Sequence, residues 1–232
     1  MNKFRKWYAQ KTATKMVDVL NAKGYDAHYA EDLQTAREMV LKIVPAGSSV
    51  ALGGSETLKD MGLVSFFKES DDYNFFDRYQ NIPFEDTVEI YRQSMLADYL
   101  VTGTNALTRT GELVNVDSSG NRVAGMIFGP KRVVIVCGTN KVVDNLDEAM
   151  KRIKKIAPMN ALRVGHKVPC NETGVCEDCQ IQQSVCNYIG IINSGRKFEG
   201  RISIIMIAEE CGFYERFINV RPIWFGVFCM PH

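Results

Sequence analysis

The sequence lacks several features that would assign a protein class directly. It has no run of about 18 apolar residues, so we expect no membrane-spanning helix. Its 28 basic and 27 acidic residues give a net charge of +1, and this balance does not support a nucleic-acid-binding protein. Low-complexity tracts and internal repeats are also absent. Hydrophobic residues make up 46% of the 232 positions, which suits one medium domain with an appendage, or two small domains.

Further absences narrow the chemistry. The first residues are basic and polar and no apolar core follows them, so we expect no secretory signal and a cytoplasmic location. Neither a Walker loop nor a Rossmann Gly-x-Gly-x-x-Gly fingerprint is present. The three histidines, His28, His166 and His232, do not combine with other residues into a recognisable hydrolytic triad.

Cysteine, in contrast, is concentrated near the C-terminus. Cys170, Cys176, Cys179 and Cys186 lie within seventeen residues. The two-residue gap between Cys176 and Cys179 lets two thiolates hold one ion. Four sulfur ligands suit either zinc or an iron–sulfur cluster. The pattern therefore predicts a metal-binding segment over residues 165–195, with these four cysteines as ligands.

Two alternatives for the four cysteines stay open. Disulfides are disfavoured by the odd total of seven cysteines and by the expected reducing compartment. Free cysteines can instead pack as small hydrophobic side chains, which suits Cys137 and Cys211 but not the polar residues around the other four. His166 precedes Cys170 by four residues and is either an alternative metal ligand or a surface residue.

Helical and strand-like patterns alternate along the chain. Helical spacing of apolar residues predicts an opening helix ending at Gly24 and helices over residues 32–43, from residue 56, and over residues 82–96 and 145–156. Short apolar runs predict strands over residues 25–30, 49–52, 73–76, 99–103, 112–116, 132–137 and 202–207. Pro158 is expected to break the helical pattern. This alternation predicts an α/β domain with a mostly parallel sheet flanked by helices.

The first of two candidate ligand loops follows the strand over residues 49–52. Gly53 and Gly54 allow the backbone to bend sharply and to approach a ligand closely. Ser55, or the amides of Glu56 and Thr57, can then hold an anion at the start of the next helix. An ordinary strand-to-helix turn is the plain alternative.

The second candidate loop contains Thr102, Gly103 and Asn105, at the end of another expected strand, where open α/β sheets bind ligands. Arg122 is the candidate cation, because a guanidinium can hold two oxygens at once. Turns stabilised by asparagine are the plain alternative here. Three further cations are expected to be solvated surface residues: Lys131, Arg132 and Lys141.

These loops resemble the lactate-utilisation (LUD) domain family over residues 10–212. The matching segments are residues 51–58, 97–106 and 136–143, with Gly111, Asn115, Asn121, Arg122, Gly129 and Pro130 in the intervals. The resemblance implies a fold like that of ribose-5-phosphate isomerases, glucosamine-6-phosphate deaminases and CoA transferases. It also implies a role near lactate oxidation, in which related proteins act beside iron–sulfur partner subunits.

The resemblance also bears on the chemistry. Sugar-phosphate isomerases of the wider superfamily carry an acidic base after the strand that ends in glycine, where this chain has Asn105. An amide cannot serve as that base, so a sugar isomerase is disfavoured. Glu56 can be compared with the glutamate nucleophile of CoA transferases, but the residues around it do not match those enzymes well. Because the family points to redox metabolism, a [4Fe–4S] cluster is favoured over zinc for the four cysteines.

Three functions follow as hypotheses. The first is a redox accessory subunit of organic-acid (lactate) oxidation with a cysteine-ligated metal centre. The second is a small-molecule-binding protein or transferase that acts on a phosphorylated, carboxylate or CoA ligand, and the third is a zinc-stapled structural subunit. The expected organisation is an α/β domain over residues 1–212, which includes segment 165–195, followed by an atypical aromatic tail over residues 213–232. Catalysis by the isolated chain and formation of a homo-oligomer are left open.

Overall fold

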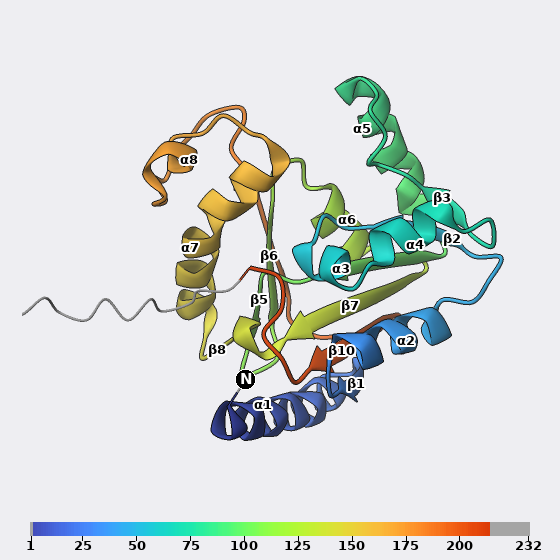
Figure 1. The fold of residues 1–232 in the computed structure, drawn as a ribbon, viewed down its shortest axis with the longest axis vertical. Helices are drawn as coiled ribbons and strands as arrows, with labels where there is room; N and C mark the ends of the chain where they lie inside the picture. Colours follow the sequence, from blue (N-terminus) through green and yellow to red (C-terminus); the bar gives the residue numbers. More distant parts are fainter. Residues whose placement is uncertain (1, 214–232) are drawn as a thin grey trace, which may run out of the picture.

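The computed structural model describes residues 2–213, and a parallel six-stranded sheet lies at its centre (Figure 1). The strand order is β1-β10-β7-β4-β2-β3, and each neighbouring pair runs parallel. The strands are β1 (Asp26–Ala30), β2 (Ser49–Leu52), β3 (Asn74–Phe76), β4 (Tyr99–Gly103), β7 (Arg132–Gly138) and β10 (Ile202–Ile207). The predicted α/β fold with a mostly parallel sheet is confirmed.

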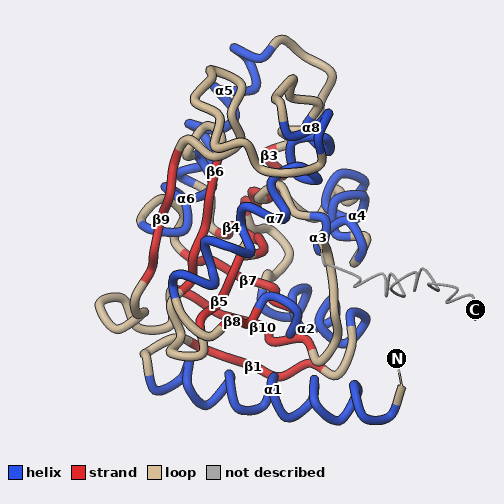
Figure 2. Tube along the Cα trace, turned by 90° about the vertical axis from the view of Figure 1, so that its left-hand side faces the viewer, coloured by secondary structure: helices blue, strands red, loops and turns tan. Residues whose placement is uncertain are grey.

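Helices cover both faces of this sheet. The α-helices of residues 2–213 are α1 (Lys3–Ala22), α2 (Leu33–Ile43), α3 (Glu56–Asp60), α4 (Leu63–Glu69), α5 (Phe84–Gln93), α6 (Asn121–Ile127), α7 (Leu146–Val164) and α8 (Cys170–Thr173), and not all of them contact this sheet. Alternate residues of β7 point to opposite faces, so Ile135 packs with Met16 of α1 while Val136 packs with Val40 of α2 and Phe67 of α4. Figures 1 and 2 both show α1 alongside β1 at the edge of the sheet.

A second sheet of four strands lies beside the first, in the order β8-β5-β6-β9. It contains β5 (Ala106–Thr108), β6 (Leu113–Asp117), β8 (Val142–Val143) and β9 (Tyr188–Ile192). Residues 104 and 105 connect β4 of the main sheet directly to β5 of the second sheet. Of these strands only β6 was expected; β5 and β8 are three and two residues long, and β9 is a largely exposed edge strand.

Helix α7 corrects one prediction. Pro158 does not break it, and the helix continues to Val164 before Gly165 ends it at a φ of 71°. A proline inside a helix removes one backbone hydrogen bond. Here the buried face of α7 continues on both sides of the proline, with Ile153 in one apolar cluster and Ala161 in another. Packing along that face therefore outweighs the missing hydrogen bond.

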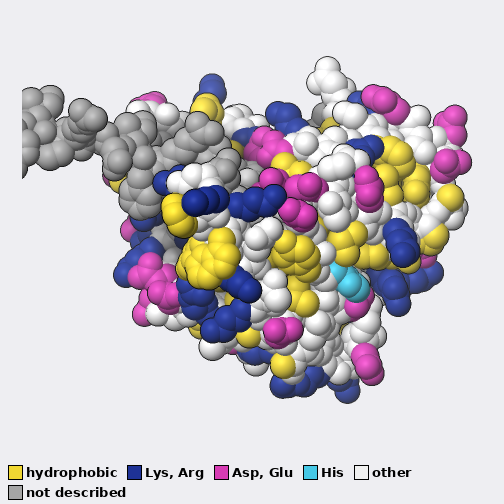
Figure 3. All heavy atoms as spheres, turned by 60° about the horizontal axis from the view of Figure 1, so that its bottom comes forward, with side chains coloured by type: hydrophobic (Ala, Val, Ile, Leu, Met, Phe, Trp, Pro, Cys, Tyr) yellow, Lys and Arg dark blue, Asp and Glu magenta, His cyan; other side chains and the backbone are white. Residues whose placement is uncertain are grey.

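Two further expectations concern the surface. No helix within residues 2–213 combines the length and the apolar character that crossing a membrane requires. The face in Figure 3 shows hydrophobic side chains among charged side chains of both signs. Apart from Phe213, the aromatic tail expected over residues 213–232 lies outside the described residues.

Candidate functional site

A cleft of about 710 Å³ opens where β2 and β4 end. These strands are neighbours in the sheet, so the two predicted loops lie side by side, and the amide of Gly53 donates to the carbonyl of Val101 at 2.9 Å. Six of the eight predicted ligand residues line the cleft: Gly54, Ser55, Glu56, Gly103, Asn105 and Arg122. The structure thus brings both loops to one edge of the sheet, as the sequence predicts.

Gly53 and Thr102 lie beneath the cleft rather than on its wall. A Cβ atom on Gly53 would lie 2.2 Å from the Thr102 hydroxyl oxygen and 3.0 Å from Cδ of Arg122. Thr102 itself is fully buried. The structure therefore requires glycine at position 53 because the two loops pack closely, whereas our sequence argument invoked close approach of a ligand.

The helix that follows Ser55 begins at Glu56 as expected and is short. Helix α3 spans five residues, and the Ser55 side chain makes no capping hydrogen bond. So short a helix has little macrodipole, so the helix-end argument for anion binding loses its basis. Ser55 instead lies close to the second loop, with its Oγ 2.8 Å from the position that a Cβ on Gly103 would take.

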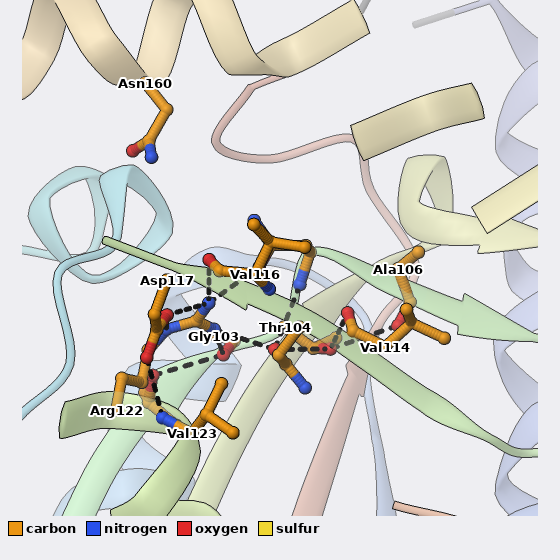
Figure 4. Close-up of polar contacts among 12 residues, drawn as sticks. Gly103, Thr104, Ala106, Val114, Val116, Asp117, Arg122, Val123 and Asn160 are labelled. Carbon is orange, nitrogen blue, oxygen red and sulfur yellow. Dashed lines mark hydrogen bonds and ion pairs between the residues drawn. The ribbon is translucent and has the colours of Figure 1, made fainter. Parts of the chain in front are cut away.

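Arg122 holds the second loop together from below (Figure 4). Its five guanidinium N–H groups have protein acceptors, at distances from 2.6 to 3.2 Å: Asp117 Oδ1, Asn115 Oδ1, Asn105 Oδ1 and the carbonyls of Gly103 and Val116. Asp117 also accepts a 2.7 Å hydrogen bond from the amide of Val123 in α6. Arg122 therefore joins the β4–β5 connection, β6 and α6, and its donors face the protein rather than the cleft.

Lys141 is buried, which corrects the expectation of a solvated side chain. It ends the short 3-10 turn after β7 (Thr139–Lys141) and is 5% exposed, whereas Lys131 and Arg132 are exposed as expected. Its Nζ donates to the Thr57 hydroxyl at 2.9 Å. Within residues 2–213, Lys141 forms no ion pair with a carboxylate.

The position of Lys141 follows from the strand order. β7 lies next to β4, so the residues after its carboxyl end reach the same sheet edge as the two glycine loops. Lys141 Nζ lies 3.4 Å from the position that a Cβ on Gly103 would take. The signal available in the sequence was its place directly after a buried strand.

Among residues 2–213, more positive than negative side chains line the cleft. Five cations line it (Arg78, Arg122, Lys141, Arg152 and Arg163) against two carboxylates (Glu56 and Asp117). Asp117 pairs with Arg122 at 2.7 Å, and Glu56 lies 3.7 Å from Arg163. Burial lowers the pKa of Arg163 while Glu56 raises it, and a guanidinium stays charged at neutral pH. The surplus of positive charge favours an anionic ligand.

Helix α7 and the cysteine segment (residues 165–195) form the opposite wall of the cleft. Asn160 projects from α7 toward the Arg122 network in Figure 4, and its Oδ1 accepts hydrogen bonds from Arg163. His166 also lines the cleft, with its Nδ1 2.6 Å from the carbonyl oxygen of Gln183. The wall continues through Gln182, Gln183, Val185 and Asn187, which the sequence did not identify as site residues.

The four predicted metal ligands are free thiols within residues 170–186. Cys170 is buried on α8, and Cys179 packs against its apolar cluster. Burial, followed by the neighbouring Cys176, Cys179 and Cys170, raises the pKa of Cys186 to about 11. Over residues 2–213, no three Cys, His, Asp or Glu side chains are close enough together to hold a metal ion. The free thiols fit a sulfur-ligated metal in chemistry, and the metal centre stays a prediction.

Comparisons with known proteins give the family. The model of the LUD domain matches residues 13–207, which is most of the chain. A DUF162 family protein from Deinococcus radiodurans has a similar structure, with a TM-score of 0.50 and 11% identity, over 86% of this chain and 98% of that one. No curated protein matches the sequence.

Two other solved structures are more distant. They are eIF2B delta from Chaetomium thermophilum (15% identity, 49% of each chain) and ribose 5 phosphate isomerase A from Neisseria gonorrhoeae (10% identity, 58% of this chain and 66% of that one). Both have TM-scores of 0.31, too low to carry an argument. The family match over residues 13–207 agrees with the resemblance predicted over residues 10–212 and includes every strand from β1 to β10. This chain belongs to the LUD domain family.

Proposed function

We propose that this protein binds a small organic anion, a carboxylate or a phosphate ester, in the cleft, and that it serves cytoplasmic oxidation of lactate or a related organic acid. The family supports the metabolic setting. The observation that carries the binding proposal is Lys141, a buried ammonium that has a hydroxyl as its hydrogen-bond partner and no ion pair with a carboxylate in the described chain.

A buried charge is costly unless an opposite charge or several hydrogen bonds compensate for it. A ligand anion beside Lys141 would supply the missing charge. Ser55 Oγ and Lys141 Nζ both lie beside Gly103, at 2.8 and 3.4 Å from the position that a Cβ on that residue would take, and both residues line the cleft. A ligand oxygen that contacts both groups from the cleft would receive charge-assisted hydrogen bonds. We assign these residues to binding and assign no chemical step to them.

Isothermal titration with inorganic phosphate and with pyruvate tests this proposal. The Lys141→Met variant should lose at least about tenfold in affinity, because a hydrogen bond to a charged group contributes about 1.5–3 kcal/mol. Lys131→Met is the matched control, since Lys131 has a 78% exposed side chain paired with Asp98, and its affinities should match wild type. Equal affinities in the two variants would contradict the proposal.

Stability provides the second readout for Lys141→Met. Burying a charge without a counter-charge costs free energy, and the Lys141→Met substitution removes this cost. The free energy of unfolding of the variant should therefore equal or exceed that of wild type. A fold that stays intact while binding is lost separates a ligand contact from a structural one.

A second proposal concerns the cysteine segment. We propose that Cys170, Cys176, Cys179 and Cys186 hold a [4Fe–4S] cluster or zinc, and that the protein works beside iron–sulfur partner subunits as a redox accessory subunit. The presence of four free thiols within seventeen residues of the chain supports this. A bound cluster would supply one-electron transfer, and bound zinc would act only as a structural staple.

Anaerobic purification followed by metal and sulfide analysis tests the second proposal. About four iron and four sulfide per chain would establish the cluster, and about one zinc without sulfide would establish the staple. Protein that retains neither metal nor sulfide, and that does not bind added zinc, would refute both forms.

A further inference from the structure

We infer that the cleft takes a nucleotide-type ligand, with its phosphate at Lys141 and Arg163 and its flat base against Arg78, Tyr91 and Phe84. The inference rests on the proposed anion binding and adds a second half to that site.

The size of the cleft is the first argument. A volume of about 710 Å³ far exceeds what a three-carbon acid occupies. Pockets of roughly 300–1,000 Å³ are the range that holds drug-sized and cofactor-sized molecules. A ligand that contacts both the residues at the sheet edge and those of α5 therefore has to extend well beyond one anionic group.

Two groups of cleft residues differ in chemistry. Ser55 and Lys141 follow strands of the main sheet, and Arg163 of α7 faces the same loops, with its guanidinium nitrogens 3.3 Å from the position that a Cβ on Gly54 would take. The other group includes Phe84 and Tyr91 of α5. The first group thus suits a phosphate and the second suits a flat apolar group.

Helix α5 has an unusual environment. No residue of α5 is fully buried, and Phe84 is 63% exposed while it lines the cleft. Figures 1 and 2 show α5 projecting from the body at the same end as α8. A large aromatic side chain exposed at the wall of a cleft is surface that a bound ring would cover.

Arg78 and Tyr91 already form a stacked platform. The Arg78 guanidinium carbon lies 4.5 Å from the centre of the Tyr91 ring, and Arg78 also donates to the Tyr91 hydroxyl at 2.8 Å. Nucleobases stack on aromatic rings and on guanidinium planes. The hydrogen bond fixes the orientation of the platform before a ligand arrives, which lowers the entropy cost of binding.

Titration with AMP, ribose 5-phosphate and adenosine tests the inference. AMP is ribose 5-phosphate joined to adenine, and adenosine is AMP without its phosphate. AMP should bind at least about tenfold more tightly than ribose 5-phosphate, as one stacked base contributes about 1–3 kcal/mol. Adenosine should bind weakly, since it lacks the phosphate. Ribose 5-phosphate binding as tightly as AMP would overturn the inference and leave anion binding intact.

Two variants locate the base. Phe84→Ser and Tyr91→Ser should each bring the AMP affinity toward that of ribose 5-phosphate and leave ribose 5-phosphate itself unchanged. Phe4→Ser is the control, because Phe4 is 71% exposed on α1 and does not line the cleft. Equal AMP affinity in all three variants would also overturn the inference. If neither phosphate compound binds, and inorganic phosphate and pyruvate do not bind either, the proposed anion site itself is wrong.

Discussion

The cysteine segment (residues 165–195) forms part of the cleft wall, but it differs from the floor of the cleft in how far its side chains are buried and held by the protein. Below the cleft, each N–H group of the Arg122 guanidinium has an acceptor from the protein. In the cysteine segment, residues 165–187 contain one helix of four residues, and the side chains between the thiols are largely exposed. The cleft floor is thus held by buried contacts within the chain, and the exposure of the cysteine segment suits the proposal that a bound metal orders it.

Removing the Arg122 guanidinium gives the largest expected effect on this comparison. Arg122→Met would leave Asp117 and several carbonyl and amide oxygens without their donor in a buried site, so the free energy of unfolding should fall by about 3–5 kcal/mol. Equilibrium unfolding in urea measures it. Arg92→Met is the control, because Arg92 has a 70% exposed side chain, and it should change stability by less than about 0.5 kcal/mol. Similar losses in both variants would show that the network does not hold the cleft.

Replacing one thiol probes the other region. In Cys176→Ser, retained metal should be lost and proteolysis within residues 165–195 should become faster, while the free energy of unfolding of the main sheet stays within about 0.5 kcal/mol of wild type. Limited proteolysis with mass spectrometry locates the cuts. Cys137→Ser provides the contrast, since Cys137 is fully buried in β7 and burying a hydroxyl there should cost about 1–3 kcal/mol without affecting metal content. An unchanged proteolysis pattern in Cys176→Ser would show that a metal bound through Cys176 does not order this segment.

The smallest expected effect concerns Lys23, which, in contrast to Lys141, has a carboxylate partner within residues 2–213. Lys23 lies 2.5 Å from Glu112. Burial raises the pKa of Glu112, but hydrogen bonds from Lys23, Thr108 and Thr110 outweigh it and lower the pKa from 4.5 to about 2. The charged carboxylate therefore stabilises the fold above pH 4.5, and this stabilisation should fade as the pH drops from 4.5 toward 2.

Urea unfolding at several pH values between 7 and 2 measures this loss, with Glu112→Gln as the control. The variant should be less stable than wild type at neutral pH, and its stability should fall less steeply below pH 4.5. Parallel pH profiles for the two proteins would show that the pair does not contribute. The result sets a reference for Lys141, whose counter-charge we assign to a ligand.

Much of the secondary structure follows from local patterns. Asp32 and Asn145 cap α2 and α7 by accepting hydrogen bonds from backbone amides three residues on, as their side-chain chemistry favours. The apolar runs over residues 49–52, 132–137 and 202–207 form buried strands of the main sheet. Strands β5 and β8 were missed because they are three and two residues long and directly adjoin loops, and β9 was missed because it is a largely exposed edge strand with Gly190 at its centre.

The sequence by itself determined the α/β class, the positions of the two glycine loops and the grouping of four cysteines. Each depends on residues that are close along the chain, whose spacing and side-chain chemistry act locally. Only the tertiary structure decided that Lys141 is buried, that Arg122 faces the protein and that Gln183 and Val185 line the cleft. These properties depend on the order β7-β4-β2 and on the return of the chain after α7, because burial and hydrogen bonding are set by neighbours that are distant in sequence.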